Sequence, residues 1–518
     1  MFGSLSGSDS TSTPMSESDL VTPQTVQIDT HSSDFAKLPS TLPYGSSLGL
    51  ATSRLPAKSL CWPISLRPSG GSNVTSNPLR DSKEPYSPDD SDGESSQSLS
   101  IIQDGISETP DTFLDCCLPP QFIPNSQISG KNIRFVISQY EAMFSVIFFR
   151  PILAHINFVR ARFFKRIMSS NVARWSMFVG AQMFRELQQE GVDADIKRFI
   201  PWLDRLSQLC VKSSKNASLE ELIGCLAGGL ELAFLQYMVS TAKSRYTLLR
   251  HIAPMFVQIA SADPELWSRD PLSSGISLAH ALVSPHNDLA RFIFTDTATS
   301  LTFGVPPLVE YDTSHPVIQN PNGISLEWVH GCPVSFILSI AKINQWRARY
   351  PNGCWSEDMP WKEIERDTWA WRPMCEYGPD SESLKFVARL AVQEAWRHAN
   401  LIYLYMGMCC VNSHDPRVQA SVRQISRLNL TVNCHFETGK HIMIPLLIAG
   451  ICTRSESDRK GFRRVISQPI GSNKSWLLKG IDFALVLDHL WSGAGMDGGP
   501  VMWDDYVASR RRLIDIGM

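Results

Sequence analysis

The amino-acid composition changes near residue 128, and this change limits which part of the chain can fold. The first hundred positions are about one quarter serine, and Pro, Thr and Gly are frequent, which is typical of disordered chains. Such a segment buries too little apolar surface to offset the entropy lost on folding. From about Asn132 onward, apolar residues recur with helical spacing. We therefore predict a long disordered segment over residues 1–128 and one folded, all-helical domain over residues 129–518.

An acidic segment, residues 84–115, precedes the folded region. No Lys, Arg or His occurs between Lys83 and Lys131, and acidic residues alternate there with apolar ones. The apolar members include Ile101, Ile102, Ile106, Phe113 and Leu114. This pattern is typical of acidic-hydrophobic activation segments. One Ser-Pro pair (residues 87–88) and one Thr-Pro pair (residues 109–110) add sites for proline-directed phosphorylation. A solvated linker is the alternative interpretation.

The pattern after residue 129 predicts an all-α, irregular multi-helix domain. A capping box at residues 218–221 opens a long apolar helix. Residues 386–404 are apolar on nearly every side and predict a central helix, and residues 351–383 predict a long surface excursion. The last clear helix is expected at about residues 477–491, with Ile481, Leu485 and Leu490 facing inward. Neither alternating strands nor a repeat of 20 to 50 residues is evident, which argues against a parallel α/β sheet and a solenoid.

Another helix start is predicted near residue 284. Ser284 would be the N-cap and Pro285 the first helical residue, where the missing N–H of proline costs nothing. Leu289, Phe292 and Ile293 follow at helical spacing and are expected in the core.

Three apolar runs raise the question of a membrane span. Residues 401–411 and 442–452 have about half of the roughly 20 residues that a span needs. Residues 222–242 are long enough, but Glu231 lies near their middle, where a charge is costly in lipid. We predict that all three runs are buried helices and that no membrane is involved. The first residues do not resemble a secretory signal, so the twelve cysteines are expected to be reduced thiols.

No motif in the sequence indicates a metal, a nucleotide or a covalent nucleophile. Zinc sites need closely spaced pairs of Cys or His, and Cys434-His435 with His441 is the nearest approach to such a cluster. Residues 493–498 match G-x-G-x-x-G, but we expect them in a loop between helices and not between a strand and a helix. We therefore predict no catalytic residues, no cofactor-binding residues and no metal ligands.

Two other classes of protein remain as alternatives to a regulator: a helical scaffold or membrane-surface protein, and an enzyme whose active site has no motif. Catalytic groups are assembled in space, so a deep pocket with converging His and carboxylate side chains would favour an enzyme. The side chains that such a pocket would bring together are those of His398, His414, His435, His441, Glu394 and Asp415.

Basic residues gather in short patches at residues 160–166, 463–464 and 510–512. Each is typical of the solvated face or end of a helix, and a nuclear-import or phosphate-contacting patch is the alternative. The formal net charge of −3 and the pI near 6.5 argue against a protein that binds nucleic acid over its whole surface.

Residues 445–466 consist of an apolar segment followed by a highly charged segment. Pro445 suits the first turn of a short buried helix. Residues 455–458 (Ser-Glu-Ser-Asp) approximate a capping box for a second, amphipathic helix. Its inner face is predicted to carry Phe462, Val465 and Ile466, and its outer face Arg459, Lys460, Arg463 and Arg464.

Five blocks, in order, resemble the fungal-specific transcription factor domain. Residues 387–425, VARLAVQEAWRHANLIYLYMGMCCVNSHDPRVQASVRQI, are similar to its "QEAWR…IYLYM…DPRVQ" block. Residues 290–314 resemble its helix with a "TGRP…YD" turn, and residues 326–346 its "LQWLHG-P" helix start. Residues 445–466 resemble its "P-L-AG…DR" helix pair, and residues 501–506 its C-terminal tryptophan segment. The resemblance is taken to extend from about residue 130 to the C-terminus.

This resemblance implies an all-α regulatory domain of a nuclear transcription regulator, without catalytic residues. Its expected partners are the transcriptional machinery or co-regulators, and a second copy in a homodimer. The family's DNA-binding module normally lies N-terminal to this domain and holds two zinc ions with six cysteines. Before residue 130 this chain has only Cys61, Cys116 and Cys117. The resemblance therefore predicts that DNA is contacted indirectly, or through an N-terminal module that was lost or is missing from the gene model.

Overall fold

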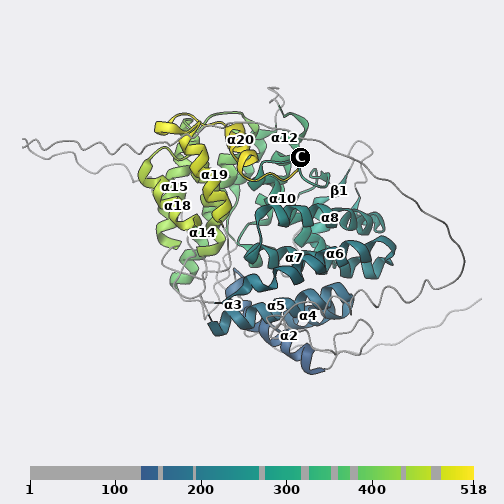
Figure 1. Ribbon diagram of the computed structural model, residues 1–518. Coiled ribbons are helices and arrows are strands. Elements are labelled where there is room, and N and C mark those ends of the chain that lie inside the picture. Colours follow the sequence, from purple (N-terminus) through teal and green to yellow (C-terminus); the bar gives the residue numbers. More distant parts are fainter. Residues whose placement is uncertain are drawn as a thin grey trace, which may run out of the picture. The chain divides into compact units, whose positions relative to one another are not determined.

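The computed structural model describes residues 130–149, 156–190, 194–267, 275–316, 326–351, 360–373, 383–432, 439–467 and 480–517. These residues are mostly helical (Figure 1), which confirms the predicted fold class. The predictions on residues 1–128 and on Cys434-His435, and about half of the predicted excursion at residues 351–383, fall outside the described residues. The described middle of that excursion is a helix packed on its neighbours, with Ile364 and Thr368 buried, so the prediction of a surface segment is wrong there.

The helices before residue 289 form a layered group. They are α2 (Gly130–Ala142), α3 (Phe144–Ile147), α4 (Ile156–Ser169), α5 (Asn171–Glu190), α6 (Ile200–Ser213), α7 (Leu219–Val239), α8 (Ala242–Ser261) and α9 (Leu278–Val283). Helix α7 packs against α5, α6 and α8, and α2, α4 and α5 lie side by side (Figure 1). Helix α7 is therefore the centre of this group.

The predicted capping box at the start of α7 is confirmed. The Ser218 hydroxyl accepts from the Glu221 backbone N–H, and the Glu221 carboxylate accepts from the Ser218 N–H at 2.9 Å. Glycines then bring α7 close to the junction of α4 and α5. A Cβ on Gly228 would lie 2.7 Å from the Ala173 nitrogen, so any larger residue would push the helices apart.

The remaining helices surround α14. They are α10 (Asn287–Phe303), α11 (Leu326–His330), α12 (Val334–Arg349), α13 (Trp361–Ala370), α14 (Ser383–Tyr403), α15 (Pro416–Val432), α17 (Met443–Ile451), α18 (Glu456–Ser467), α19 (Ile481–Ser492) and α20 (Trp503–Leu513). Helix α14 packs against α12, α13, α15 and α17, as expected for the predicted central helix. Its last turn widens into a π-helical turn, η8 (Leu404–Met408).

Short elements complete the fold. The 3₁₀ turns are η5 (Ile196–Phe199), η6 (Ser214–Asn216), η7 (Pro264–Leu266), η9 (Lys440–Ile442) and η11 (Met496–Gly498). Among the described residues the only sheet is a parallel pair, β1 (Ile276–Ser277) with β2 (Tyr311–Asp312). The predicted absence of a parallel α/β sheet thus agrees with the part of the chain that is described.

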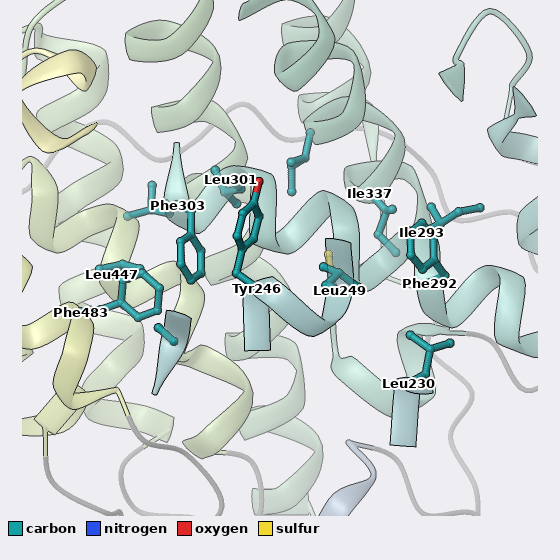
Figure 2. Packing of buried hydrophobic residues seen from close by; sticks show 14 of the residues in the cluster. Leu230, Tyr246, Leu249, Phe292, Ile293, Leu301, Phe303, Ile337, Leu447 and Phe483 are labelled. Atoms are coloured by element: carbon teal, nitrogen blue, oxygen red, sulfur yellow. The ribbon is translucent and has the colours of Figure 1, made fainter. Parts of the chain in front are cut away.

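One hydrophobic core runs through both groups of helices. The Phe256 ring of α8 stacks on Phe292 of α10 with centroids 4.5 Å apart, and Tyr246 stacks on Phe303. Figure 2 shows this layer continuing from Leu230 of α7 to Phe483 of α19. At the far end, the Asp482 carboxylate of α19 accepts from the Ala242 N–H at the start of α8, at 2.8 Å. The helices before residue 289 therefore share their core with those after it.

The three apolar runs are buried, as predicted. Helix α7 is the one described helix long and apolar enough to cross a membrane, and 78% of its apolar window is buried inside the fold. Residues 401–409 and 445–452 are also buried. Because most of this window is buried inside the fold, α7 is a core helix. Its buried Glu231 has partners that are described below.

Two predictions about helix starts and faces are wrong. Helix α10 begins at Asn287 and not after Ser284, because Ser284 ends α9 and its hydroxyl accepts from the His286 N–H at 3.2 Å. In α19, Ile481 and Leu485 are 41% and 48% exposed. The buried stripe of α19 consists of Phe483, Ala484, Val486, Leu487 and Leu490, and a further helix, α20, follows it.

The pair of helices predicted at residues 445–466 is present. Pro445 lies in the first turn of α17, and Ser455 accepts from the Asp458 N–H at 3.4 Å as the N-cap of α18. The box is half formed, because the Asp458 carboxylate accepts from the Ser426 hydroxyl. Phe462 is buried as predicted, but Arg459 is buried too and was wrongly assigned to the outer face.

Candidate functional site

The described side chains that an undetected active site would need do not come together as one group, although two of them, His398 and Glu394, form a pair. In α14, the Nε2 atom of His398 is 3.4 Å from the Glu394 carboxylate, and its Nδ1 atom is 3.2 Å from the Ser421 hydroxyl. His414 contacts the Gly498 carbonyl at 2.9 Å through Nε2. These two histidines thus have separate partners on separate elements.

The other candidates have partners of their own. The Asp415 carboxylate accepts from Arg417, and that guanidinium holds the pKa of Asp415 below its usual range. His441 lies edge-on against the Phe149 ring, with centroids 5.1 Å apart, and burial lowers its pKa. No group of three or more His, Cys, Asp or Glu that could hold a metal occurs in the described ranges. His435 lies outside those ranges, and the prediction that there are no site residues remains a prediction.

The most concentrated group of charges in the interior is centred on Glu231 of α7. We define the charge cluster as Tyr140, Arg166, Glu231, Asp288 and Arg291. The Glu231 side chain is 3% exposed, and its carboxylate accepts from the Tyr140 hydroxyl of α2 at 2.7 Å. Arg291 of α10 lies 3.1 Å from the same carboxylate, and Arg166 of α4 lies 3.7 Å from it.

The charge cluster joins four helices. Arg166 also donates to the Asp288 carboxylate of α10 at 2.8 Å, so each guanidinium has an acidic neighbour. Arg291 donates in addition to the Leu230 carbonyl at 3.2 Å. A buried carboxylate requires such partners, because an isolated ion in the interior would lose its hydration without compensation. The cluster therefore fixes α2, α4 and α7 against α10.

A second buried carboxylate, that of Asp296, lies two turns further along α10. It accepts from the Leu308 N–H and from the Tyr311 hydroxyl, both at 2.9 Å. No cation lies within ion-pair distance of it in the described structure. Burial raises the pKa of Asp296 to about 6, and its hydrogen bonds oppose that rise. Asp296 therefore anchors the loop that leads into β2, but it does so without a neutralising charge.

Arg459, which was predicted on an outer helix face, and Arg510 of the basic patch at residues 510–512 are buried and stabilise the fold. Arg459 donates to the Thr453 and Gly495 carbonyls at 3.0 and 2.6 Å. Arg510, which is 2% exposed, donates to the Phe303 carbonyl at 2.7 Å. The loop at residues 493–498 thus receives an arginine of α18, and, as predicted, it lies between helices α19 and α20 and not after a strand.

Comparison with protein families identifies the second group of helices. Residues 289–514 match the family model described as "Fungal specific transcription factor domain". All five blocks that carry the sequence resemblance lie within this range, whereas residues 130–288 lie outside it. The family is a transcription factor domain and not an enzyme family. No curated protein and no solved structure matched the chain.

Proposed function

Because residues 289–514 belong to the fungal specific transcription factor domain family, we propose that this chain regulates transcription through its helical domain. The family match carries the proposal. The chain acts through protein contacts, and its partners are co-regulators, the transcriptional machinery or a second copy of the chain. Its place of action is the nucleus.

The internal construction of the fold supports a regulatory role over a catalytic one. Apart from the pair of His398 and Glu394, in which the imidazole also contacts the Ser421 hydroxyl, the described candidate side chains have separate structural partners. The described candidates therefore do not form one set of groups around a single substrate. The buried charged groups of the described interior instead serve helix packing, with arginines and carboxylates that hold helices together.

Contact with DNA is proposed to be indirect or to need another module. The family's zinc-cluster module uses six cysteines, and residues 1–130 contain three, none in C-x-x-C spacing. The formal net charge of −3 gives no general attraction to the phosphate backbone.

A promoter-tethered reporter tests the proposal. Residues 1–518 are fused to a foreign DNA-binding module, and transcription is measured in a fungal host against the module alone. We expect transcription to change, upward or downward. The same fusion carrying Ile448→Asp should lose the effect, because Ile448 is fully buried and a carboxylate there would unfold the domain.

Arg463→Glu is the matched control one helix further along. Arg463 is exposed and pairs with Asp488 at the surface, so this variant should fold and keep the effect on transcription. Transcription indistinguishable from that of the module alone, with fusion protein present in the nucleus at normal amounts, would count decisively against the proposal.

A further inference from the structure

Helix α4 exposes an apolar face to solvent. We define the α4 outer face as Phe158, Ala161, Phe164, Lys165 and Met168. Phe158, Phe164 and Met168 are 38%, 48% and 50% exposed. They are six and four residues apart, which places them within about one third of the helix circumference. The opposite stripe, made of Val159, Phe163 and Ile167, is buried.

The same helix carries four basic residues and no acidic one. Two of them are neutralised, because Arg160 pairs with Glu141 and Arg166 belongs to the charge cluster. Arg162 and Lys165 have no carboxylate within ion-pair distance in the described ranges, and the Arg162 guanidinium lies 4.2 Å from the Phe158 ring centroid. The outer face, together with the neighbouring half-buried Arg162, thus combines exposed rings with positive charges that are not held in ion pairs. It suits a ligand that is both acidic and apolar.

The chain contains a segment of matching character. Residues 84–115 hold nine Asp or Glu and no Lys, Arg or His, and bring apolar residues such as Ile101, Ile102 and Phe113. Residues 116–129 link this segment to the start of α2, which packs against α4. At about 3.3 Å per extended residue the link spans up to roughly 45 Å. Helix α2 is only about 20 Å long, so the segment reaches the α4 outer face.

We propose that residues 84–115 bind the α4 outer face of the same chain. Aspartate and glutamate side chains face Arg162 and Lys165, and isoleucine and phenylalanine side chains cover Phe158, Phe164 and Met168. Because the link is short, the segment is present at an effective concentration on the order of 1 mM, which makes a weak contact sufficient. A bound segment is withheld from other proteins, so any partner of residues 84–115 competes with α4 for it.

Hydrogen–deuterium exchange on the full chain tests the proposal. In the wild type, amides within residues 84–115 should exchange about two- to tenfold more slowly than those of the isolated peptide, since a contact of millimolar strength leaves the segment bound for much of the time. Phe164→Ser with Met168→Ser should abolish this protection. Ile481→Ser with Leu485→Ser is the matched control, because it removes two equally exposed apolar side chains from α19.

A charge exchange makes the test specific. Arg162→Glu with Lys165→Glu should abolish protection, and adding Asp104→Lys, Glu108→Lys and Asp111→Lys should restore it at least in part. Lys212→Glu with Lys215→Glu, two exposed residues of α6 and η6, should leave protection unchanged. Unchanged exchange of α7 peptides in every variant shows that the fold is intact.

Three results would overturn the proposal. The first is exchange of residues 84–115 in the wild type at the rate of the isolated peptide. The second is protection that rises with protein concentration together with a doubled mass, which assigns the face to a second copy. The third is that the chain sediments with vesicles of phosphatidylserine and phosphatidylcholine and needs Phe164 and Lys165 to do so, whereas hydrogen exchange of residues 84–115 does not depend on these two residues. That result would assign the face to a membrane.

Discussion

Two buried carboxylates, Glu231 beside helix α10 and Asp296 on it, are stabilised in different ways. Glu231, 3% exposed, lies among two guanidinium groups and a tyrosine hydroxyl that come from three other helices. Asp296 is 1% exposed and accepts from the Leu308 N–H and the Tyr311 hydroxyl, which lie in and directly after one nearby loop. No cation of the described residues lies within ion-pair distance of it. The first links distant parts of the chain, whereas the second holds a local turn.

The difference has consequences for stability. Removing a carboxylate that is paired with arginines leaves buried cations without compensation. A carboxylate with only neutral donors titrates at a higher pH, because its charged form is poorly solvated. Variants at these two positions should therefore differ both in the size of their effect and in its pH dependence.

The largest effect is expected for Glu231→Ala. This variant leaves Arg291 without a carboxylate partner and the Tyr140 hydroxyl without its acceptor. The free energy of unfolding should fall by about 3 to 5 kcal/mol, measured by urea denaturation at neutral pH. Glu220→Ala, an exposed position in the first turn of α7, is the control and should change it by less than about 1 kcal/mol. A loss of similar size in both variants would show that the cluster does not stabilise the fold.

A smaller, pH-dependent effect is expected for Asp296→Asn. The pKa of Asp296 in the folded chain is about 6, above its ordinary value of 3.8, so the folded state binds more protons between these two values. The wild type should therefore lose stability relative to the variant as the pH rises from 4 to 7, by up to about 3 kcal/mol, with no further loss above that range.

Urea denaturation at several pH values measures this difference. The asparagine keeps an oxygen for the Leu308 N–H, and the Tyr311 hydroxyl can rotate to accept from its amide. Asp204→Asn, at an exposed position, is the control and should show no such trend. A difference between wild type and Asp296→Asn that is constant with pH would contradict the account of Asp296 as a carboxylate without a cation.

The smallest effect is expected for Arg463→Ala. The Arg463 guanidinium and the Asp488 carboxylate lie 2.8 Å apart, but their side chains are 46% and 34% exposed. Exposed ion pairs contribute about 0 to 1 kcal/mol, and salt screens them. The loss in unfolding free energy should stay within that range and vanish at 1 M salt. A loss as large as that of Glu231→Ala would mean that burial does not set the importance of ion pairs here.

Sequence reasoning identified the helices well and the buried charges poorly. The capping box of α7 and the buried run of α17 depend on local spacing, which a single sequence shows directly. Glu231 was recognised as a charge inside an apolar helix. Its partners come from positions 91 residues before it (Tyr140) and 60 after it (Arg291), and no local pattern connects them.

The misassigned residues have a common cause, which is that residue type was given more weight than position. Arg459 shares the stripe of Phe462 and Ile466 at spacings of three and seven residues, so its position on α18 already placed it inside. Arg510 likewise shares the buried stripe of α20, four residues after Tyr506 and seven after Trp503. Carbonyl groups at helix ends and in the Gly495 loop accept hydrogen bonds from these guanidinium groups, and the sequence alone does not indicate such acceptors.

The central claim is that the helices before residue 289 and the helices of residues 289–514, which match the family model, form one folding unit joined by the charge cluster. Hydrogen exchange of the full chain at increasing urea tests it most directly, with α7 and α14 peptides compared in the wild type and in Glu231→Ala. We predict that both helices open with the same free energy and that Glu231→Ala lowers it equally in both. Loss of protection in α7 while α14 keeps its wild-type value would contradict the claim.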